Sequence, residues 1–293
     1  MQVYSGSANV PLAQNLARRL IVPMGVVERS RFANDEARVW VKEPKVDREV
    51  IVVQSLSQPT DHHLIEFCLI CDALRRRGAK EITAVIPWLG YSKQDKVFRA
   101  GEPLSVKVIA SMIETVKLER IITIDLHNLA ILGFFETPVD NLSAKPLFID
   151  YFNGVSQTTM VVAPDAGAVK ASTQFAQQME VPVAYIDKKR DLVSGQVSIV
   201  GLSRPVKGFD LIIVDDLIVT GGTLLEVADY LMAKGAKSVR VGATHHTYVK
   251  GVQGKLDRSM IDQMVVTNTI QAQTKSKKLK VLDVSGLIAE SLV

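Results

Sequence analysis

Short runs of β-branched residues return along the whole chain, and most are apolar at every position rather than at alternate ones. Strands of that kind are covered on both faces, which is typical of parallel sheets with helices on either side. Segments with a helical apolar period lie between the runs, near 62–77, 104–116, 166–178 and 223–234. The pattern predicts an α/β fold of doubly wound parallel sheets. The predicted strands are 50–54, 82–87, 120–125, 159–163, 183–187, 210–215, 238–243 and 264–268.

The 293 residues suggest two domains rather than one. Gly-Ala-Lys precedes a predicted strand twice, at 78–80 and 235–237, which indicates two related halves. We place a boundary near 143–148 and expect domains over 1–145 and 146–293, with a last helix that could pack back on the first domain. The segment 24–44 differs, because Val-Trp-Val alternation follows a polar Asn-Asp-Glu sequence. It predicts an antiparallel β-hairpin that projects from the first sheet.

The composition limits the class of protein. A net charge of +4 with 23% charged residues suits a protein that handles anionic small molecules, and not a nucleic-acid-binding tail. No apolar run reaches the roughly 18–20 residues that a membrane helix needs, and the first residues show no secretory signal. Two cysteines form no disulfide framework, which fits a reducing compartment. We expect a soluble, cytoplasmic protein with no nucleic-acid or membrane partner, whose lysine run at 274–281 is a solvated turn before a last strand.

Several common catalytic motifs are absent. The sequence contains no G-x-x-x-x-G-K-[ST], G-x-G-x-x-G, H-E-x-x-H or G-x-S-x-G, which disfavours P-loop ATPases, Rossmann dehydrogenases, zincins and α/β-hydrolases. His62, His63, Cys68 and Cys71 have a spacing at which zinc binding is conceivable. The cysteines continue the apolar stripe of a predicted helix, however, so we interpret them as buried, inert thiols.

The strongest signal is the sequence LIIVDDLIVTGGT at 211–223. A buried strand delivers Asp215 and Asp216 at its carboxyl end, where ligands bind in open α/β sheets. The turn Thr220-Gly221-Gly222-Thr223 then opens a helix, and such a turn offers backbone N–H groups to a phosphate. The two acids suit ribose hydroxyls or a magnesium ion. A site for a sugar that carries a 5-phosphate meets both demands.

This sequence resembles the phosphoribosyl-pyrophosphate loop shared by type I phosphoribosyltransferases and the ribose-phosphate diphosphokinase (PRPP synthetase) family. Four further segments resemble the synthetase family specifically and two more complete the set, so that the likeness covers nearly the whole chain. They are 5–17, 31–39, 84–105, 123–135, APDAGAVK at 163–170 and IDKKR at 186–190. The resemblance implies two phosphoribosyltransferase-type domains and transfer of the β,γ-diphosphoryl group of ATP to the C1 oxygen of ribose 5-phosphate, giving PRPP and AMP. The short stretch 94–102 resembles archaeal-type members more than the usual bacterial ones.

The resemblance also assigns residues. It implies that Lys188 and Arg190 are the catalytic pair, on a mobile loop that closes over the phosphates, where fixed positive charge stabilises the transferred group. It implies that His127 and Asp165, which each follow a buried strand, bind Mg²⁺ at the domain cleft. The implied ribose 5-phosphate residues are Arg190, Asp215, Asp216, Val219, Thr220, Gly221, Gly222 and Thr223.

The same resemblance implies that ATP is shared between subunits. The hairpin residues Asn34, Asp35 and Glu36 would offer acceptors to the adenine and ribose of a neighbour's ATP, and Phe32 a stacking face. Lys93 and Gln94 align with an ATP-contacting pair, and Lys96 and Arg99 would add positive charge over the triphosphate. The implied partners are therefore ATP, ribose 5-phosphate and a second copy of this chain, in a homo-oligomer that is at least a dimer.

Three departures from the family pattern stand out. Val219 replaces an acid that most members carry, and Lys93 replaces an arginine, which keeps the charge but loses bidentate geometry. The segment 128–135 lacks the usual glutamines, which puts regulation by ADP and phosphate in doubt. Two alternatives stay open: a phosphoribosyltransferase that uses PRPP as substrate, and a catalytically inactive regulatory paralogue of the synthetase.

Overall fold

The computed structural model describes residues 1–154, 158–190 and 197–292, without the side chains of residues 190 and 197. The chain divides into two compact units, which are described separately. Unit 1 comprises Met1–Ser143, Asn268–Gln271 and Asp283–Val293, and unit 2 comprises Ala144–Thr267 and Ala272–Leu282. Among the described residues, no helix has both the length and the apolar character to span a membrane.

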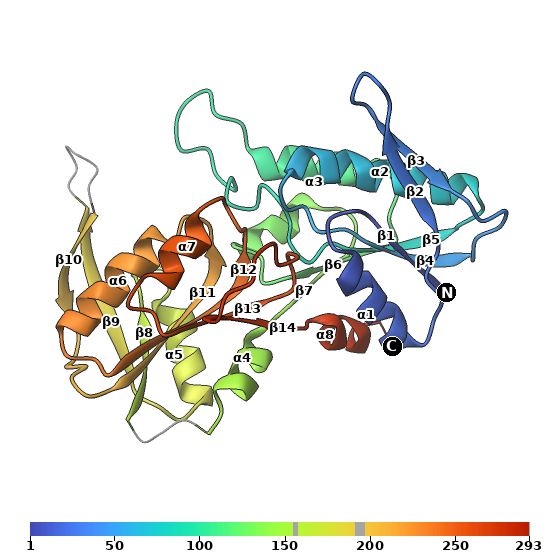
Figure 1. The fold of residues 1–293 in the computed structure, drawn as a ribbon. Coiled ribbons are helices and arrows are strands. Elements are labelled where there is room, and N and C mark those ends of the chain that lie inside the picture. Colours follow the sequence, from blue (N-terminus) through green and yellow to red (C-terminus); the bar gives the residue numbers. More distant parts are fainter. Residues whose placement is uncertain (155–157, 191–196, 293) are drawn as a thin grey trace. The chain divides into compact units, whose positions relative to one another are not determined.

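Unit 1 is built on a five-stranded parallel sheet in the order β1-β4-β5-β6-β7. Helices cover both faces of this sheet, α2 and α3 on one and α1 and α8 on the other (Figure 1). The strands are β1 (Gln2–Ser5), β4 (Glu49–Val53), β5 (Glu81–Val85), β6 (Arg120–Ile124) and β7 (Val139–Leu142). The helices are α1 (Val10–Leu20), α2 (Thr60–Arg76), α3 (Ser105–Glu114), the 3₁₀ helix η1 (Leu129–Phe134) and α8 (Ser285–Glu290).

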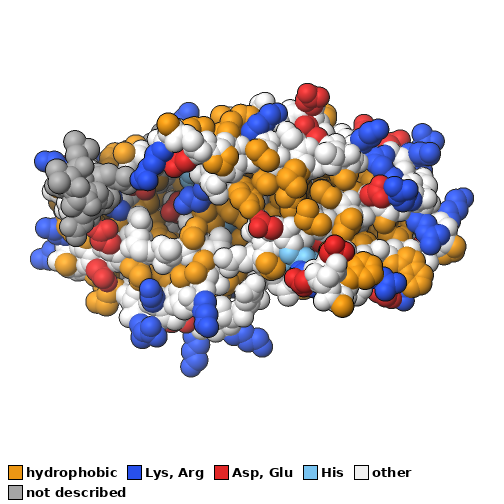
Figure 2. Space-filling view, turned by 90° about the horizontal axis from the view of Figure 1, so that it is seen from above, with side chains coloured by type: hydrophobic (Ala, Val, Ile, Leu, Met, Phe, Trp, Pro, Cys, Tyr) orange, Lys and Arg blue, Asp and Glu red, His pale blue; other side chains and the backbone are white. Residues whose placement is uncertain are grey.

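The outer faces of α2 and α3 carry apolar side chains. Ile65 and Leu69 on α2 and Val108 on α3 are all exposed, by 38 to 53%. The two helices are neighbours, because the Sγ atom of Cys68 lies 4.0 Å from the carbonyl oxygen of Met112. The face seen in Figure 2 carries a broad group of hydrophobic side chains. A surface of this kind is typical of a protein–protein contact.

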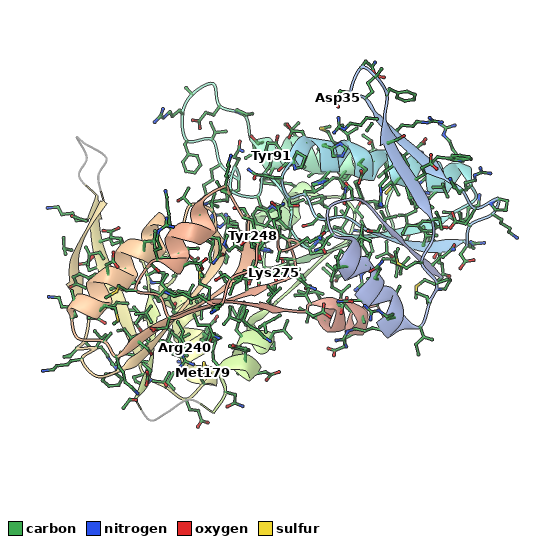
Figure 3. The ribbon with its side chains drawn as sticks, viewed as in Figure 1. Asp35, Tyr91, Met179, Arg240, Tyr248 and Lys275 are labelled. Atoms are coloured by element: carbon green, nitrogen blue, oxygen red, sulfur yellow. The ribbon has the colours of Figure 1, made fainter. Side chains whose placement is uncertain are left out.

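The predicted hairpin is confirmed. Strands β2 (Val27–Arg31) and β3 (Ala37–Val41) pair antiparallel, and β3 also packs against α2. Asp35 at the tip has a φ of +68° and is labelled in Figure 3. The backbone N–H groups of Phe32 and Asp35 donate to Glu36 and Phe32, which closes the tip. A short polar turn between alternating strands was sufficient to predict this element.

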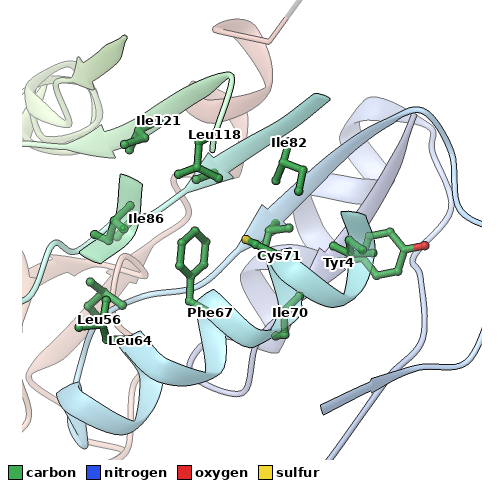
Figure 4. Close-up of a cluster of buried hydrophobic side chains, with 14 of the residues drawn as sticks. Tyr4, Leu56, Leu64, Phe67, Ile70, Cys71, Ile82, Ile86, Leu118 and Ile121 are labelled. Carbon is green, nitrogen blue, oxygen red and sulfur yellow. The ribbon is translucent and has the colours of Figure 1, made fainter. Parts of the chain in front are cut away.

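The core of unit 1 explains why the two cysteines are inert. Cys71 is fully buried beside Phe67 and Ile70 on the inner face of α2, as Figure 4 shows, and Cys68 is half-buried. Burial raises the pKa of both thiols. Both groups therefore stay protonated, unlike the thiolates that bind zinc. The interpretation of this segment as a buried apolar stripe is confirmed.

Unit 2 is built on a seven-stranded sheet in the order β10-β9-β8-β11-β12-β13-β14, antiparallel between β9 and β10 and parallel elsewhere. Helices α6 and α7 cover one face and α4 and α5 the other (Figure 1). The strands are β8 (Thr159–Ala163), β9 (Val183–Arg190), β10 (Val197–Leu202), β11 (Asp210–Ile218), β12 (Ser238–His246), β13 (Gln263–Thr267) and β14 (Leu279–Leu282). The helices are α4 (Lys145–Phe152), α5 (Val169–Gln178), α6 (Gly222–Ala233) and α7 (Val252–Asp257).

All eight predicted strands and four predicted helices are present, and the last strand, β14, begins within the lysine run at Leu279. The sequence reasoning missed three short strands, β1, β7 and β10, none of which has a long apolar run. Strands β11 and β12 also extend beyond the predicted ends, because Leu217 and Ile218 keep pairing with His245 and His246. These extra residues carry the strands into the region of the predicted site.

The chain's last residues belong to unit 1. The side-chain amide of Asn9 donates to the carbonyl of Asn268 at 2.6 Å, and Ser55 Oγ donates to the carbonyl of Thr269 at 2.6 Å. Helix α8 packs against α1, where Arg19 Nε donates to Ser285 Oγ at 2.8 Å. Polar contacts therefore fix the C-terminal segment on the first sheet.

Candidate active site

The order of strands in unit 2 creates a switch point. Strands β8 and β11 are neighbours, and the chain continues from β8 toward β9 on one side and from β11 toward β12 on the other. In open α/β sheets, ligands bind beyond the carboxyl ends of the strands at such a reversal. Asp165 follows β8 directly, and Asp215 lies near the end of β11. Two predicted site residues are therefore brought together at this edge.

Asp215 has an unusual protonation equilibrium. Burial, a hydrogen bond and charge from Asp216, and the charge of Asp165 together raise the pKa of Asp215 to about 7. The Asp216 backbone N–H donates to Asp215 Oδ1 at 2.8 Å, which partly offsets this effect. A crowded group of carboxylates gains from a cation or from hydroxyl donors in its vicinity. The negative charge at this position therefore favours binding of a cation or of hydroxyl groups.

The residues after β11 form a tight turn. Gly221 has a φ of +71°, which favours glycine over any residue with a Cβ, and α6 begins at the next residue. No side chain caps this helix, and its first turn holds no acidic residue. Thr220, Gly222 and Thr223 are exposed, whereas Val219 is half-buried. The turn thus presents N–H groups and two hydroxyls, the donors that a phosphate takes at a helix N-terminus.

Asp165 is held by its own turn. Its Oδ1 accepts a hydrogen bond of 3.0 Å from the backbone N–H of Ala168, and its side chain is half-buried. This contact orients the carboxylate at the start of α5. Carboxylate oxygens are the ligands that Mg²⁺ prefers, so this oriented carboxylate suits the ion.

Lys188 and Arg190 lie on strand β9, so the prediction that both sit on a loop is wrong for their backbone. Lys188 pairs with Ile199 of the antiparallel strand β10. The residue pattern of one strand alone does not predict such pairing. Side chains alternate along a strand, so Lys188 shares the face of the buried Ala184 and Ile186. Lys189 is exposed on the opposite face. The side chain of Arg190 lies outside the described part of the chain.

The hairpin tip places the predicted adenine contacts in solvent. Asn34, Asp35 and Glu36 are exposed, and Phe32 is 51% exposed. Asp35 is not independent of its surroundings: its Oδ1 lies 2.7 Å from Nη1 of Arg31, which also donates to its carbonyl at 2.6 Å. The tip is therefore an ordered polar surface beside one exposed aromatic ring.

A second group of predicted ATP contacts lies in the segment between β5 and α3. Lys93, Gln94 and Lys96 are exposed. Gln94 is fixed at the start of α3, because its Oε1 accepts a hydrogen bond of 2.7 Å from Ser105 Oγ. Arg99 is also exposed, and its backbone N–H donates to Glu102 at 3.1 Å. This segment carries three cations on an anchored backbone.

His127 follows β6 and is exposed. The next residue, Asn128, begins η1, where its Oδ1 accepts from the backbone N–H of Ala130 at 3.0 Å. Its Nδ2 donates to Asp95 Oδ2 at 2.5 Å, which joins the His127 turn to the Lys93–Lys96 segment. Sequence reasoning missed Asp95 and Asn128. The only available signal was their position beside predicted site residues.

The described residues contain no group of three His, Cys, Asp or Glu side chains placed to hold a metal ion together. Mg²⁺ is commonly bound through one or two protein carboxylates together with substrate phosphates. Asp165 and the neighbouring Asp215 fit that donor chemistry, because their mutual repulsion already favours a cation.

Two family models match the N-terminal and C-terminal parts of the chain. The family model for the N-terminal domain of ribose phosphate pyrophosphokinase matches residues 1–116, and that of the phosphoribosyl synthetase-associated domain matches residues 192–293. Curated relatives named ribose-phosphate pyrophosphokinase include those of Burkholderia pseudomallei, 38% identical over 99% of this chain and 93% of the relative, and Wolinella succinogenes, 36% identical over 99% and 94%. A closer likeness to archaeal-type members finds no support in these bacterial relatives.

A solved structure shows the same architecture. The crystal structure of phosphoribosylpyrophosphate synthetase from Mycobacterium smegmatis superposes with a TM-score of 0.91 and 33% sequence identity. The match covers 99% of this chain and 97% of that one. The likeness therefore extends over both units and is not confined to the turn after β11.

Proposed function

The chain belongs to the ribose-phosphate pyrophosphokinase family, and from that premise we propose how its residues divide the work. As a member of the family, the enzyme transfers the diphosphoryl group of ATP to the C1 hydroxyl of ribose 5-phosphate, giving PRPP and AMP. PRPP is a precursor for nucleotide biosynthesis. The proposed division of roles rests on one observation above all, the carboxylates and the uncapped turn that meet beyond β8 and β11.

Ribose 5-phosphate is assigned to the turn after β11. The backbone N–H groups of residues 220–223 and the hydroxyls of Thr220 and Thr223 bind the 5-phosphate. Asp215 and Asp216 accept from the ribose hydroxyls, which satisfies carboxylates that otherwise repel each other. Val219 supplies only its backbone at a position where a side-chain acceptor would add one more sugar contact.

Catalysis is assigned to positive charge rather than to a covalent intermediate. The C1 oxygen attacks the β-phosphorus of ATP, the bond from the β-phosphorus to the α,β-bridging oxygen breaks, and the hydroxyl proton is released with AMP. Such a transition state is loose, so positioning and charge neutralisation supply most of the acceleration. Lys188, held on β9 with its ammonium on the face of Ile186, neutralises charge on the transferred group. Arg190 is proposed as its partner and as a contact of ribose 5-phosphate.

ATP is assigned to unit 1 residues. Phe32 stacks on the adenine, and Asn34, Asp35 and Glu36 accept from its amino group and from the ribose. Lys93, Gln94 and Lys96 contact the triphosphate, on a backbone that Ser105 and Asn128 keep in place. The exposure of all these side chains supports a role in binding a ligand or a neighbouring subunit.

Magnesium is the proposed cofactor. Asp165 and His127 would hold it, and the ion would neutralise the phosphate oxygens of ATP when bound. The fit rests on the oriented carboxylate of Asp165 and on the excess negative charge around Asp215.

Assembly into a homo-oligomer is proposed because the exposed apolar side chains on unit 1 are better explained at an interface. Ile65, Leu69, Val108 and the exposed ring of Trp40 on the hairpin supply that surface. A cytoplasmic location is proposed because Cys68 and Cys71 are both unpaired, as in reducing compartments.

One assay tests the proposal as a whole. Purified protein with Mg²⁺, ATP and ribose 5-phosphate should yield PRPP and AMP, which a coupled assay for AMP detects. Chelation of the metal should stop the reaction, and added Mg²⁺ should restore it. Formation of ADP in place of AMP would contradict diphosphoryl transfer, and activity in the presence of chelator would contradict the role of the metal.

A further inference from the structure

The turn after β11 is hydrogen-bonded to the connection between β12 and α7 at one end and lies close to α7 at the other. The backbone N–H of Thr247 donates to the carbonyl of Ile218 at 3.0 Å, and its hydroxyl donates to the same oxygen at 3.2 Å. At the other end, a methyl group added to Gly221 would lie 3.2 Å from Cδ2 of Leu256 on α7. The conformation of this connection therefore influences the position of the turn.

The connection holds three buried side chains with unusual polar contacts. His246 and Tyr248, which is labelled in Figure 3, stack with ring centroids 4.1 Å apart and planes within 6°. Tyr248 has a φ of +52°, a backbone conformation that residues with a side chain rarely adopt. Its N–H donates to Nδ1 of His246 at 2.9 Å, which stabilises this conformation. Nδ1 is therefore an acceptor, and the ring proton belongs on Nε2.

Gln253 completes the group from α7. Its Nε2 donates to Oδ1 of Asp257 at 2.7 Å, and Ser276 Oγ donates to the same oxygen at 2.6 Å. The carboxamide is thereby oriented, which leaves Oε1 as an acceptor for the opposite side. Burial lowers the pKa of His246 to about 4, while interaction with the Gln253 side chain acts in the opposite direction. A neutral His246 offers a donor at Nε2, and the oriented Gln253 offers an acceptor at Oε1, so the two side chains have complementary polar groups.

Three polar atoms at this position are buried and have no hydrogen-bond partner in the described part of the chain: Nε2 of His246, Oη of Tyr248 and Oε1 of Gln253. The three residues are no more than 7% exposed. Buried polar groups without partners reduce stability, and apolar side chains of similar shape would fill the same space without that penalty. Polar residues here are better explained by the fixed geometry that they impose than by the stability that they contribute.

We propose that His246, Tyr248 and Gln253 form a polar brace that positions the turn 219–223 for ribose 5-phosphate. His246 sets the conformation of the β12–α7 connection through the N–H of Tyr248, and Gln253, oriented on α7 by Asp257, presents its Oε1 as the polar group from that helix. The brace touches neither substrate, so these are positioning residues. This inference rests on the proposed assignment of the turn to the 5-phosphate.

The experiment compares His246→Leu, His246→Asn and wild type in the full-length enzyme. Asparagine keeps an acceptor for the Tyr248 N–H, whereas leucine keeps bulk without an acceptor. Because small misplacements of a binding group are costly, we expect His246→Leu to raise the KM for ribose 5-phosphate by about tenfold or more. The KM for ATP should change by less than about twofold, and His246→Asn should recover most of the lost affinity. Lys250→Ala, an exposed change in the same connection, serves as the matched control.

The outcomes separate the brace from the assignment of the turn. Calorimetry with ribose 5-phosphate is performed on wild type and on Thr223→Ala first. If Thr223→Ala binds as well as wild type, the turn itself is wrongly assigned. If Thr223→Ala is weakened but folded His246→Leu is not, or if asparagine is no better than leucine, the brace is refuted. If His246→Leu fails to fold, Gln253→Leu takes its place with the same expected separation of the two KM values.

Discussion

Asn128 donates a hydrogen bond of 2.5 Å to Asp95 from the turn that carries His127. The two residues are 33 positions apart, yet the contact ties together two segments that we assign to ATP and to magnesium. Asn128 also caps η1 through Ala130. One side chain therefore fixes both segments.

We predict that Asn128→Ala raises the KM for ATP by about tenfold, because the loss of both contacts frees the Lys93–Lys96 segment. Steady-state kinetics at saturating ribose 5-phosphate measures the change. Asn128→Asp keeps the cap but places a like charge against Asp95, so it should be at least as impaired. An unchanged KM for ATP in both variants would separate this contact from ATP binding.

Lys188→Ala should lower kcat by about 10²–10³ with a modest change in KM, since one preorganised charge at the transition state is worth that much. Lys189→Ala is the matched control, because Lys189 lies on the opposite face of β9 and is exposed. The rates of AMP formation by wild type and by the two variants give the comparison. Activity of Lys188→Ala within about threefold of wild type would remove this lysine from the mechanism.

Asp215→Asn and Thr223→Ala should weaken ribose 5-phosphate binding and leave ATP binding nearly intact. In the proposed assignment, the hydroxyl and the turn bind the phosphate, and the acid binds the sugar. Isothermal titration calorimetry with each ligand measures the two affinities separately. The reverse result, with ATP binding lost and sugar phosphate binding retained, would exchange the two assignments.

His246 should make the protein sensitive to mild acid. Burial lowers its pKa to about 4 in the folded protein, from the ordinary value of 6.5, so the fold favours the neutral ring. The stability it contributes is complete above pH 6.5 and is lost as the pH falls toward 4. Over this pH range, the free energy of unfolding should fall more for wild type than for His246→Asn, by on the order of 2 kcal/mol. Urea unfolding at pH 7 and pH 4.5 measures it, and equal losses would show that the histidine titrates normally.

Two inactive variants should restore activity to each other if the active site is shared between subunits. Glu36→Ala removes an acceptor from the hairpin, and Lys188→Ala removes the catalytic charge. After mixing and reassembly, some interfaces pair an intact hairpin with an intact Lys188, so partial activity should return. Light scattering gives the oligomeric state, and co-purification of two differently tagged variants shows that the oligomers have mixed. Fully active monomers, or mixed oligomers without regained activity, would contradict the shared site.

The parts that could be predicted from the sequence are those that local patterns determine. Asp215 and Asp216 follow a continuous apolar run and the glycine turn comes four residues later, so their position in the C-terminal half of a strand could be predicted. Lys188 was misplaced on a loop because its strand is extended by pairing with β10, whose own sequence has no clear strand pattern. The contact between Asp95 and Asn128 depends on tertiary structure, which local patterns do not encode.

The polar brace was missed for a related reason. In the sequence, nothing distinguishes His246 and Tyr248 from other residues at the end of a strand. The positive φ of Tyr248 places its N–H against the ring of His246. Gln253 enters from the next helix. Pattern reading finds the residues that touch substrate more easily than those that hold them in place.

The return of the C-terminus to unit 1 has a consequence for the order of synthesis. A ribosome releases residues 283–293 only after all of unit 2 has been made, so unit 1 lacks its last helix while every strand of unit 2 has already been synthesised. A premature stop just before Asp283 would leave unit 2 with all its strands. It would remove from the earlier-made half the partners of Asn15, Arg19 and Arg120. Truncation of the C-terminus would therefore remove stabilising contacts from unit 1, which contains the N-terminus.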